Sequence, residues 1–134
     1  MKNKILTTVS LLCICIFALS FRVEQQPSAW KVPDNYLKMA NPDKATPASI
    51  TSGKSLFVKY CVECHGKKGT GNGPKSTDLK TSPADMTKSS FQSQSDGSLF
   101  YKISEGRNEM PKFKKEITDP DDIWSIVNYV RTLK

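Results

Sequence analysis

The residues best suited to chemistry lie together in the run Cys61-Val62-Glu63-Cys64-His65. The C-x-x-C-H pattern is typical of covalent attachment of a c-type haem. If the segment is helical, the two thiols share one face with side chains about 5–6 Å apart, which suits thioether bonds to the two vinyl groups of one porphyrin. His65 follows at once, so we expect its imidazole to be the proximal iron ligand. The pattern predicts one haem c.

Three other uses of these thiols have to be weighed. A structural zinc site needs four Cys or His ligands, but His65 is the only histidine and the other two cysteines lie near the N-terminus. A redox dithiol of the thioredoxin type requires a preceding strand, whereas the residues before Cys61 have the pattern of an amphipathic helix. A plain disulfide between Cys61 and Cys64 is the third alternative. Haem attachment is favoured over all three.

Met110 is the best candidate for a second iron ligand. It stands directly before Pro111, and proline restricts its predecessor to extended conformations. The side chain of Met110 is therefore held out of any helix with its thioether free to point inward. Met86, which lies in a similar loop, is the competing candidate. The alternative for either methionine is that it fills a gap in the core, as this pliable side chain often does.

The N-terminus has the features of an export signal in residues 1–20. Lys2 and Lys4 precede an apolar run from Ile5 to Leu19, which is shorter than the roughly 20 residues of a spanning helix. Cleavage is expected after Ser20. An uncleaved membrane anchor, or a lipid on Cys13 or Cys15, is the alternative. Because haem is attached to thiols outside the bacterial cytoplasmic membrane, a periplasmic or exported location agrees with the C-x-x-C-H motif.

The chain is long enough for one modest domain, which we place at residues 49–134 after a proline-rich extension at 21–48. Apolar residues make up 37% of the sequence, with eight prolines and seven glycines, so the core is thin and a haem would enlarge it. Helices are expected from a cap at Thr51 or Ser52 to Tyr60, from Ser95 or Asp96 to Glu105, and from a cap at Asp119 to Leu133. The first and last of these should cross, since Gly53 inside a helix favours a close neighbour.

Net charge is +7, and removal of Lys2 and Lys4 with a signal leaves +5. An exported protein with no basic and aromatic array is not expected to bind nucleic acid. A basic face that docks on acidic redox partners is favoured, because complementary charge speeds encounter. The candidate residues are five lysines, whose alternative role is solvation alone: Lys67, Lys68, Lys112, Lys114 and Lys115.

Residues 51–134 resemble a class I, monohaem cytochrome c. The resemblance lies in C-x-x-C-H after a first helix, the Met110-Pro111 loop and an aromatic-bearing last helix. It implies an all-α fold of three to five short helices around one covalent haem, with His65 and Met110 on the iron. It also implies a contact of Gly53 and Phe57 with Trp124 or Tyr129. The loop at residues 69–74 is similar to that of small monohaem subunits of bacterial respiratory or oxidoreductase complexes.

These observations predict a one-electron carrier that is not itself an enzyme. With histidine and methionine on the iron, no site is left for oxygen or peroxide, and thioether ligation raises the reduction potential. The alternative is a haem enzyme or gas sensor in which the sixth position is open. A third possibility keeps the carrier role but confines it to one membrane-associated oxidoreductase complex. The extension at residues 21–48 would then dock on a partner subunit.

Overall fold

The computed structural model describes residues 29–134, of which residues 31–134 form one compact unit. This described part contains six α-helices and no strand, so the expected all-α fold is confirmed, with one helix more than the three to five that were expected. The three longest helices are α3 (Pro47–Tyr60), α6 (Asp96–Glu105) and α7 (Pro120–Val130). Three single-turn helices and two 3-10 turns complete the set: α2 (Asp34–Leu37), α4 (Val62–His65), α5 (Ser89–Gln92), Ser76–Asp78 and Phe113–Lys115.

The predicted export signal at residues 1–20, and with it Cys13 and Cys15, lies outside the described residues. Within residues 29–134, none of the helices has the length and hydropathy needed to cross a bilayer.

The first long helix begins earlier than the sequence predicted. Thr46 caps α3 by accepting a hydrogen bond from the backbone N–H of Ser49 at 3.1 Å, and Pro47 occupies the first turn. The predicted cap at Thr51 or Ser52 is therefore wrong. Proline at the first helical position loses no hydrogen bond and has a suitable φ, so Pro47 starts the helix instead of ending the segment before it.

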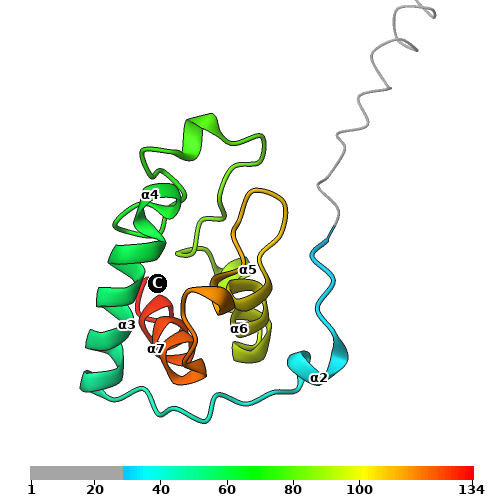
Figure 1. The fold of residues 1–134 in the computed structure, drawn as a ribbon, viewed down its shortest axis with the longest axis vertical. Helices are drawn as coiled ribbons and strands as arrows, with labels where there is room; N and C mark the ends of the chain where they lie inside the picture. Colours follow the sequence, from blue (N-terminus) through cyan, green and yellow to red (C-terminus); the bar gives the residue numbers. More distant parts are fainter. Residues whose placement is uncertain (1–28) are drawn as a thin grey trace, which may run out of the picture. The chain divides into compact units, whose positions relative to one another are not determined.

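Helices α3 and α7 cross at Gly53, and Figure 1 shows the green and red helices lying against each other. A Cβ atom on Gly53 would lie 1.9 Å from the backbone oxygen of Ser125. Beside this point the rings of Phe57 and Tyr129 pack with centroids 5.2 Å apart. The predicted crossing is confirmed with Tyr129 as the aromatic partner, while Trp124 stacks on Phe100 of α6 at 4.3 Å.

Both predicted ends of α6 and the predicted start of α7 are also confirmed, but α7 ends at Val130 and not at the predicted Leu133. Ser95 caps α6 and Gly106, with φ of 59°, ends it. Asp119 caps α7 by accepting a hydrogen bond from the backbone N–H of Asp121 at 3.0 Å. The core between the long helices is apolar, and its most deeply buried side chains come from α3 and α7: Phe57, Ile123, Ile126 and Val127.

Residues 31–46 lie along the helical body as a strap, which Figure 1 shows in cyan running from α2 to the start of α3. At one end the ring of Tyr36 packs on Tyr101 with centroids 4.8 Å apart. At the other end the Asp43 carboxylate accepts a hydrogen bond from Asn128 Nδ2 at 3.1 Å. A Cβ on Gly97 would lie 2.0 Å from the backbone oxygen of Tyr36. The strap is packed too closely to be a free linker.

Candidate haem-binding site

The C-x-x-C-H motif forms a helical turn at the end of α3. The backbone N–H of Cys61 donates to Phe57 O at 2.9 Å, and that of His65 donates to Cys61 O at 2.9 Å. The helical spacing assumed from the sequence is therefore present. Both thiols are free, and the side chain of Cys61 is buried. Burial, with a smaller contribution from Cys64, raises the pKa of the Cys61 thiol to about 12, which shows how apolar its surroundings are.

The glycine-rich loop after the motif folds back over the motif's own main chain. The N–H groups of Gly71 and Gly73 donate to the carbonyl oxygens of His65 and Cys64 at 2.9 and 3.1 Å. Gly71 has φ of 79°, a region that glycine enters without strain. These bonds satisfy the carbonyl groups at the end of the α4 turn. They also fix where His65 stands.

The imidazole of His65 is largely buried. Burial lowers the pKa of His65, while the nearby backbone of Ala84 opposes part of that effect. The Nδ1 atom has no hydrogen bond of normal geometry. Burial of the ring favours its neutral form. The neutral ring is the form that binds metals.

Met110 lies in a tight turn on a different segment, between α6 and the Phe113–Lys115 turn. Its backbone forms a reciprocal pair with Arg107, with both N–H to O distances at 3.0 Å. Asn108 in the turn has φ of 54°. The Met110 side chain is partly buried and packs against the core cluster. Its main chain is thus held by a short closed loop.

Met86, the competing methionine, is more deeply buried at 7% exposure. Its N–H donates to Gly69 O at 2.7 Å, and its carbonyl oxygen accepts from Gln92 Nε2 at 2.7 Å. A Cβ added to Gly69 would lie 3.4 Å from its sulfur. These contacts favour a packing role for Met86.

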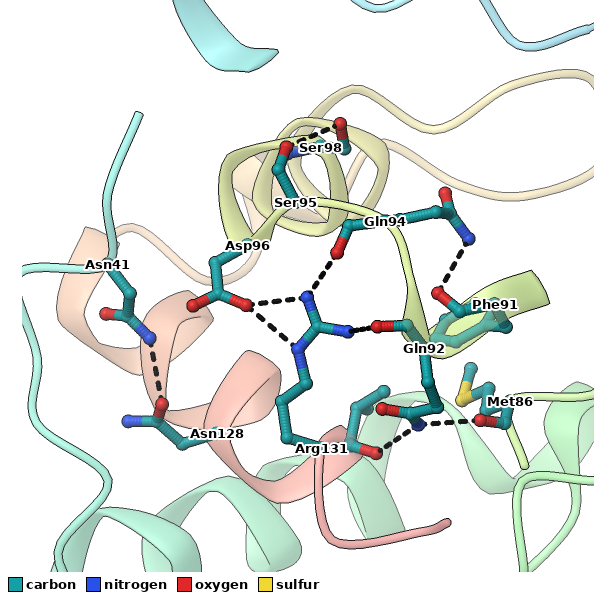
Figure 2. Close-up of polar contacts among 11 residues, drawn as sticks. Asn41, Met86, Phe91, Gln92, Gln94, Ser95, Asp96, Ser98, Asn128 and Arg131 are labelled. Carbon is teal, nitrogen blue, oxygen red and sulfur yellow. Dashed lines mark hydrogen bonds and ion pairs between the residues drawn. The ribbon is translucent and has the colours of Figure 1, made fainter. Parts of the chain in front are cut away.

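Figure 2 shows the polar network that surrounds this packing site. Arg131 donates from Nε and Nη2 to Asp96 Oδ1, at 2.9 and 2.7 Å, and from Nη1 to Gln92 O at 2.6 Å. The amide of Gln92 also donates to Val130 O at 3.0 Å. The end of α7 is therefore tied to the segment between α5 and α6, with its last carbonyl groups satisfied.

The donor set of the site fits a c-type haem. Two unpaired thiols, a buried imidazole and a thioether in a turn are the groups that attach and ligate such a haem. The zinc alternative is disfavoured, because residues 29–134 contain no group of three His, Cys, Asp or Glu side chains placed to hold a metal ion. The thioredoxin alternative is disfavoured too, since helix α3 and not a strand precedes Cys61.

Three residues near the site were missed by sequence reasoning: Ala84, Gln92 and Glu109. Ala84 acts through its backbone near His65, so its residue type carries no signal. Glu109 accepts hydrogen bonds from the backbone of Lys80 and Thr81. Its position directly before Met110 is the one signal that could have drawn attention to it.

Comparison with known families supports the same class of protein. The fold and the motif define a c-type cytochrome domain. Residues 48–130 match the family described as cytochrome c oxidase, cbb3-type, subunit III, and this chain belongs to that family. Family membership makes it a haem-based electron-transfer domain, with haem c as the implied cofactor.

Two similar proteins are longer than this chain, which spans only part of each. The chain is 33% identical over 79 residues to the quinohemoprotein alcohol dehydrogenase ADH IIB of Pseudomonas putida, a stretch covering 59% of this chain and 11% of that enzyme. It also resembles a chain of the reducing HAO-like protein complex of Kuenenia stuttgartiensis, with a TM-score of 0.63 and 26% identity. That match covers 82% of this chain and 52% of the other.

Proposed function

We propose that this chain is a one-electron carrier with one haem c, attached at Cys61 and Cys64 and ligated by His65 and Met110. When bound, the haem supplies a ferric and ferrous couple that accepts and returns single electrons. The two thiols would hold the group by thioether bonds, and the imidazole of His65 would supply a nitrogen ligand to the iron. The thioether of Met110 would be a second iron ligand, which would keep oxygen and peroxide from the metal.

The observation that carries this proposal is the state of His65. Its imidazole is largely buried directly beside two free thiols, and burial lowers the pKa of His65. The neutral imidazole that burial favours is the form that binds metals. Ligation of a haem tethered at the neighbouring cysteines would use this imidazole.

Replacement of Met110 tests the sixth ligand. In oxidised holoprotein, Met110→Ala should lose the iron–thioether absorption band and bind added imidazole at least about 10-fold more tightly, because no internal ligand competes. Titration followed by absorbance measures both. Met86→Leu, which conserves volume, is the matched control and should keep the band. An unchanged spectrum in Met110→Ala would point to the open-site haem enzyme or gas sensor.

Export and assembly complete the proposal. Residues 1–20 are proposed to direct the chain to the periplasm, where haem is attached. The domain then serves as an electron-transfer subunit of a larger oxidoreductase. Two observations support this assembly: the domain matches a small part of the Pseudomonas putida enzyme and about half of a chain in the Kuenenia stuttgartiensis complex.

Basic residues next to the proposed ligands suit acidic redox partners. Lys67 and Lys68 are exposed and follow His65 closely, while Lys112 follows Met110. Within residues 29–134, Lys114 is paired with Glu105 at 2.6 Å, and the other four candidate lysines take part in no ion pair. Their charge is therefore available to a partner.

Charge reversal tests the docking face. The Lys67→Glu/Lys68→Glu variant should be reduced by anionic ferrocyanide about 10-fold more slowly at low salt, because electrostatic steering is lost. Stopped-flow absorbance gives the rate. The control Lys44→Glu/Lys54→Glu makes the same charge change at two exposed lysines farther from His65, one just before α3 and one in the middle of this helix. Equal slowing in both variants would contradict a localised docking face.

A further inference from the structure

The Glu109 side chain connects two loops that are far apart in sequence. Its Oε1 and Oε2 atoms accept hydrogen bonds from the N–H of Lys80 at 3.1 and 2.9 Å, and Oε2 also accepts from the N–H of Thr81 at 3.3 Å. Hydrogen bonds to a charged acceptor are stronger than those between neutral groups. One carboxylate thus binds two successive backbone N–H groups on the segment that follows the Ser76–Asp78 turn.

The turn that carries Glu109 is closed within itself. Arg107 and Met110 exchange backbone hydrogen bonds at 3.0 Å in both directions. At its base, a Cβ on Gly106 would lie 2.3 Å from the carbonyl oxygen of Met110, and Gly106 has φ of 59°. The turn is therefore a unit closed by its own backbone contacts. The position of the turn relative to the rest of the domain depends on contacts made by its exposed side chains. Glu109, which is immediately before Met110, makes such a contact.

We propose that Glu109 is a positioning residue, which holds the Met110 turn against the backbone of Lys80 and Thr81 so that the thioether stays available to the iron. This inference rests on the proposed ligation by Met110. A methionine on a loop competes with external ligands in proportion to the time the loop spends in its binding position. Anchoring the turn increases that time. Releasing the turn would give external ligands access to the iron, although the sulfur of Met110 itself would be unchanged.

Imidazole binding to the oxidised holoprotein measures this competition. Glu109→Ala removes both acceptor atoms and should tighten imidazole binding about 5-fold. Glu109→Gln keeps one neutral acceptor and should tighten it about 2-fold. The matched control is Glu105→Gln, because Glu105 pairs with the side chain of Lys114. This control should bind imidazole as the unaltered protein does.

A double-mutant cycle separates positioning from a general loosening of the fold. In a protein that already carries Met110→Ala, Glu109→Ala should cause no further gain in imidazole affinity, since there is no thioether left to position. An equal gain in both backgrounds would overturn the proposal. Amide hydrogen exchange of the holoprotein gives an independent readout: the N–H groups of Lys80 and Thr81 should exchange faster in Glu109→Ala but not in Glu105→Gln. Unchanged exchange would also overturn it.

The outcomes distinguish this inference from the proposed ligation. If Met110→Ala tightens imidazole binding and Glu109→Ala does not, the positioning role is wrong and the ligation stands. If Met110→Ala itself has no effect, the ligation is wrong and the inference is overturned with it. Should Glu109→Ala fail to fold, Glu109→Gln carries the test through its smaller shift and the exchange of the same two amides.

Discussion

Replacing Cys61 and Cys64 together by serine is expected to abolish covalent haem attachment. A serine hydroxyl does not form the thioether bonds to the porphyrin, so both tethers are lost while the side-chain volume hardly changes. The measurement is a pyridine haemochrome spectrum of protein expressed with a competent maturation pathway and extracted with acidified acetone, which removes haem that is not covalently bound. The double variant should retain none, and each single variant should retain less than the unaltered protein.

The matched control changes the two other cysteines. Cys13→Ser/Cys15→Ser removes the same number of thiols from outside the described residues, and it should leave the haem content of the mature protein unchanged. A colourless unaltered protein, matured under the same conditions, would contradict the proposed function directly. Loss of haem in the control would instead show that the N-terminal cysteines are needed for export or maturation.

The second large effect is expected at the crossing of α3 and α7. In an open helix, Gly53→Ala would stabilise by about 1 kcal/mol. Here the added Cβ would lie 1.9 Å from the Ser125 carbonyl oxygen, so the helices have to separate. We expect a net loss of about 3 kcal/mol in the free energy of unfolding, at the upper end for overpacked sites. The midpoint temperature should fall by more than about 10 °C. Thermal and denaturant unfolding of the holoprotein measure both quantities.

Ser55→Ala is the control for the same helix. Ser55 is exposed and its hydroxyl donates to Thr51 O at 3.1 Å, so its replacement should change the free energy of unfolding by less than about 0.5 kcal/mol. The test is whether Gly53→Ala lowers or raises the free energy of unfolding. Stabilisation by alanine would mean that α3 and α7 do not approach closely at this point in solution.

Features specified by neighbouring residues could be predicted from the sequence. Ser95 and Gly106 marked the ends of α6, and Asp119 with Pro120 marked the start of α7. Each depends on capping chemistry within a few residues. The start of α3 was missed although Thr46 and Pro47 carry the same kind of signal, because both residues were assigned to the proline-rich extension at 21–48. The signal for the start of α3 was therefore present in the neighbouring residues but was given too little weight.

The crossing of α3 and α7 was predicted from Gly53, but polar contacts between distant segments could not be predicted in this way. The hydrogen bonds from Asn128 to Asp43, from Arg131 to Asp96, and from Lys80 and Thr81 to Glu109 join residues 85, 35, 29 and 28 positions apart. No periodicity or spacing rule relates such residues. They meet because the path of each loop is decided by the packing of the helices it connects.

The sequence alone determined which chemistry is proposed for this protein. The thiols and the imidazole of the C-x-x-C-H motif lie within one turn, where the spacing of the chain sets their arrangement. Only the tertiary structure decided that Gly53 meets the main chain of Ser125, that His65 is largely buried near the backbone of Ala84, and that Glu109 reaches the backbone of Lys80. The physical reason is that helix crossings and loop paths result from many weak contacts summed over the whole core, none of which is specified by residues close together in the chain.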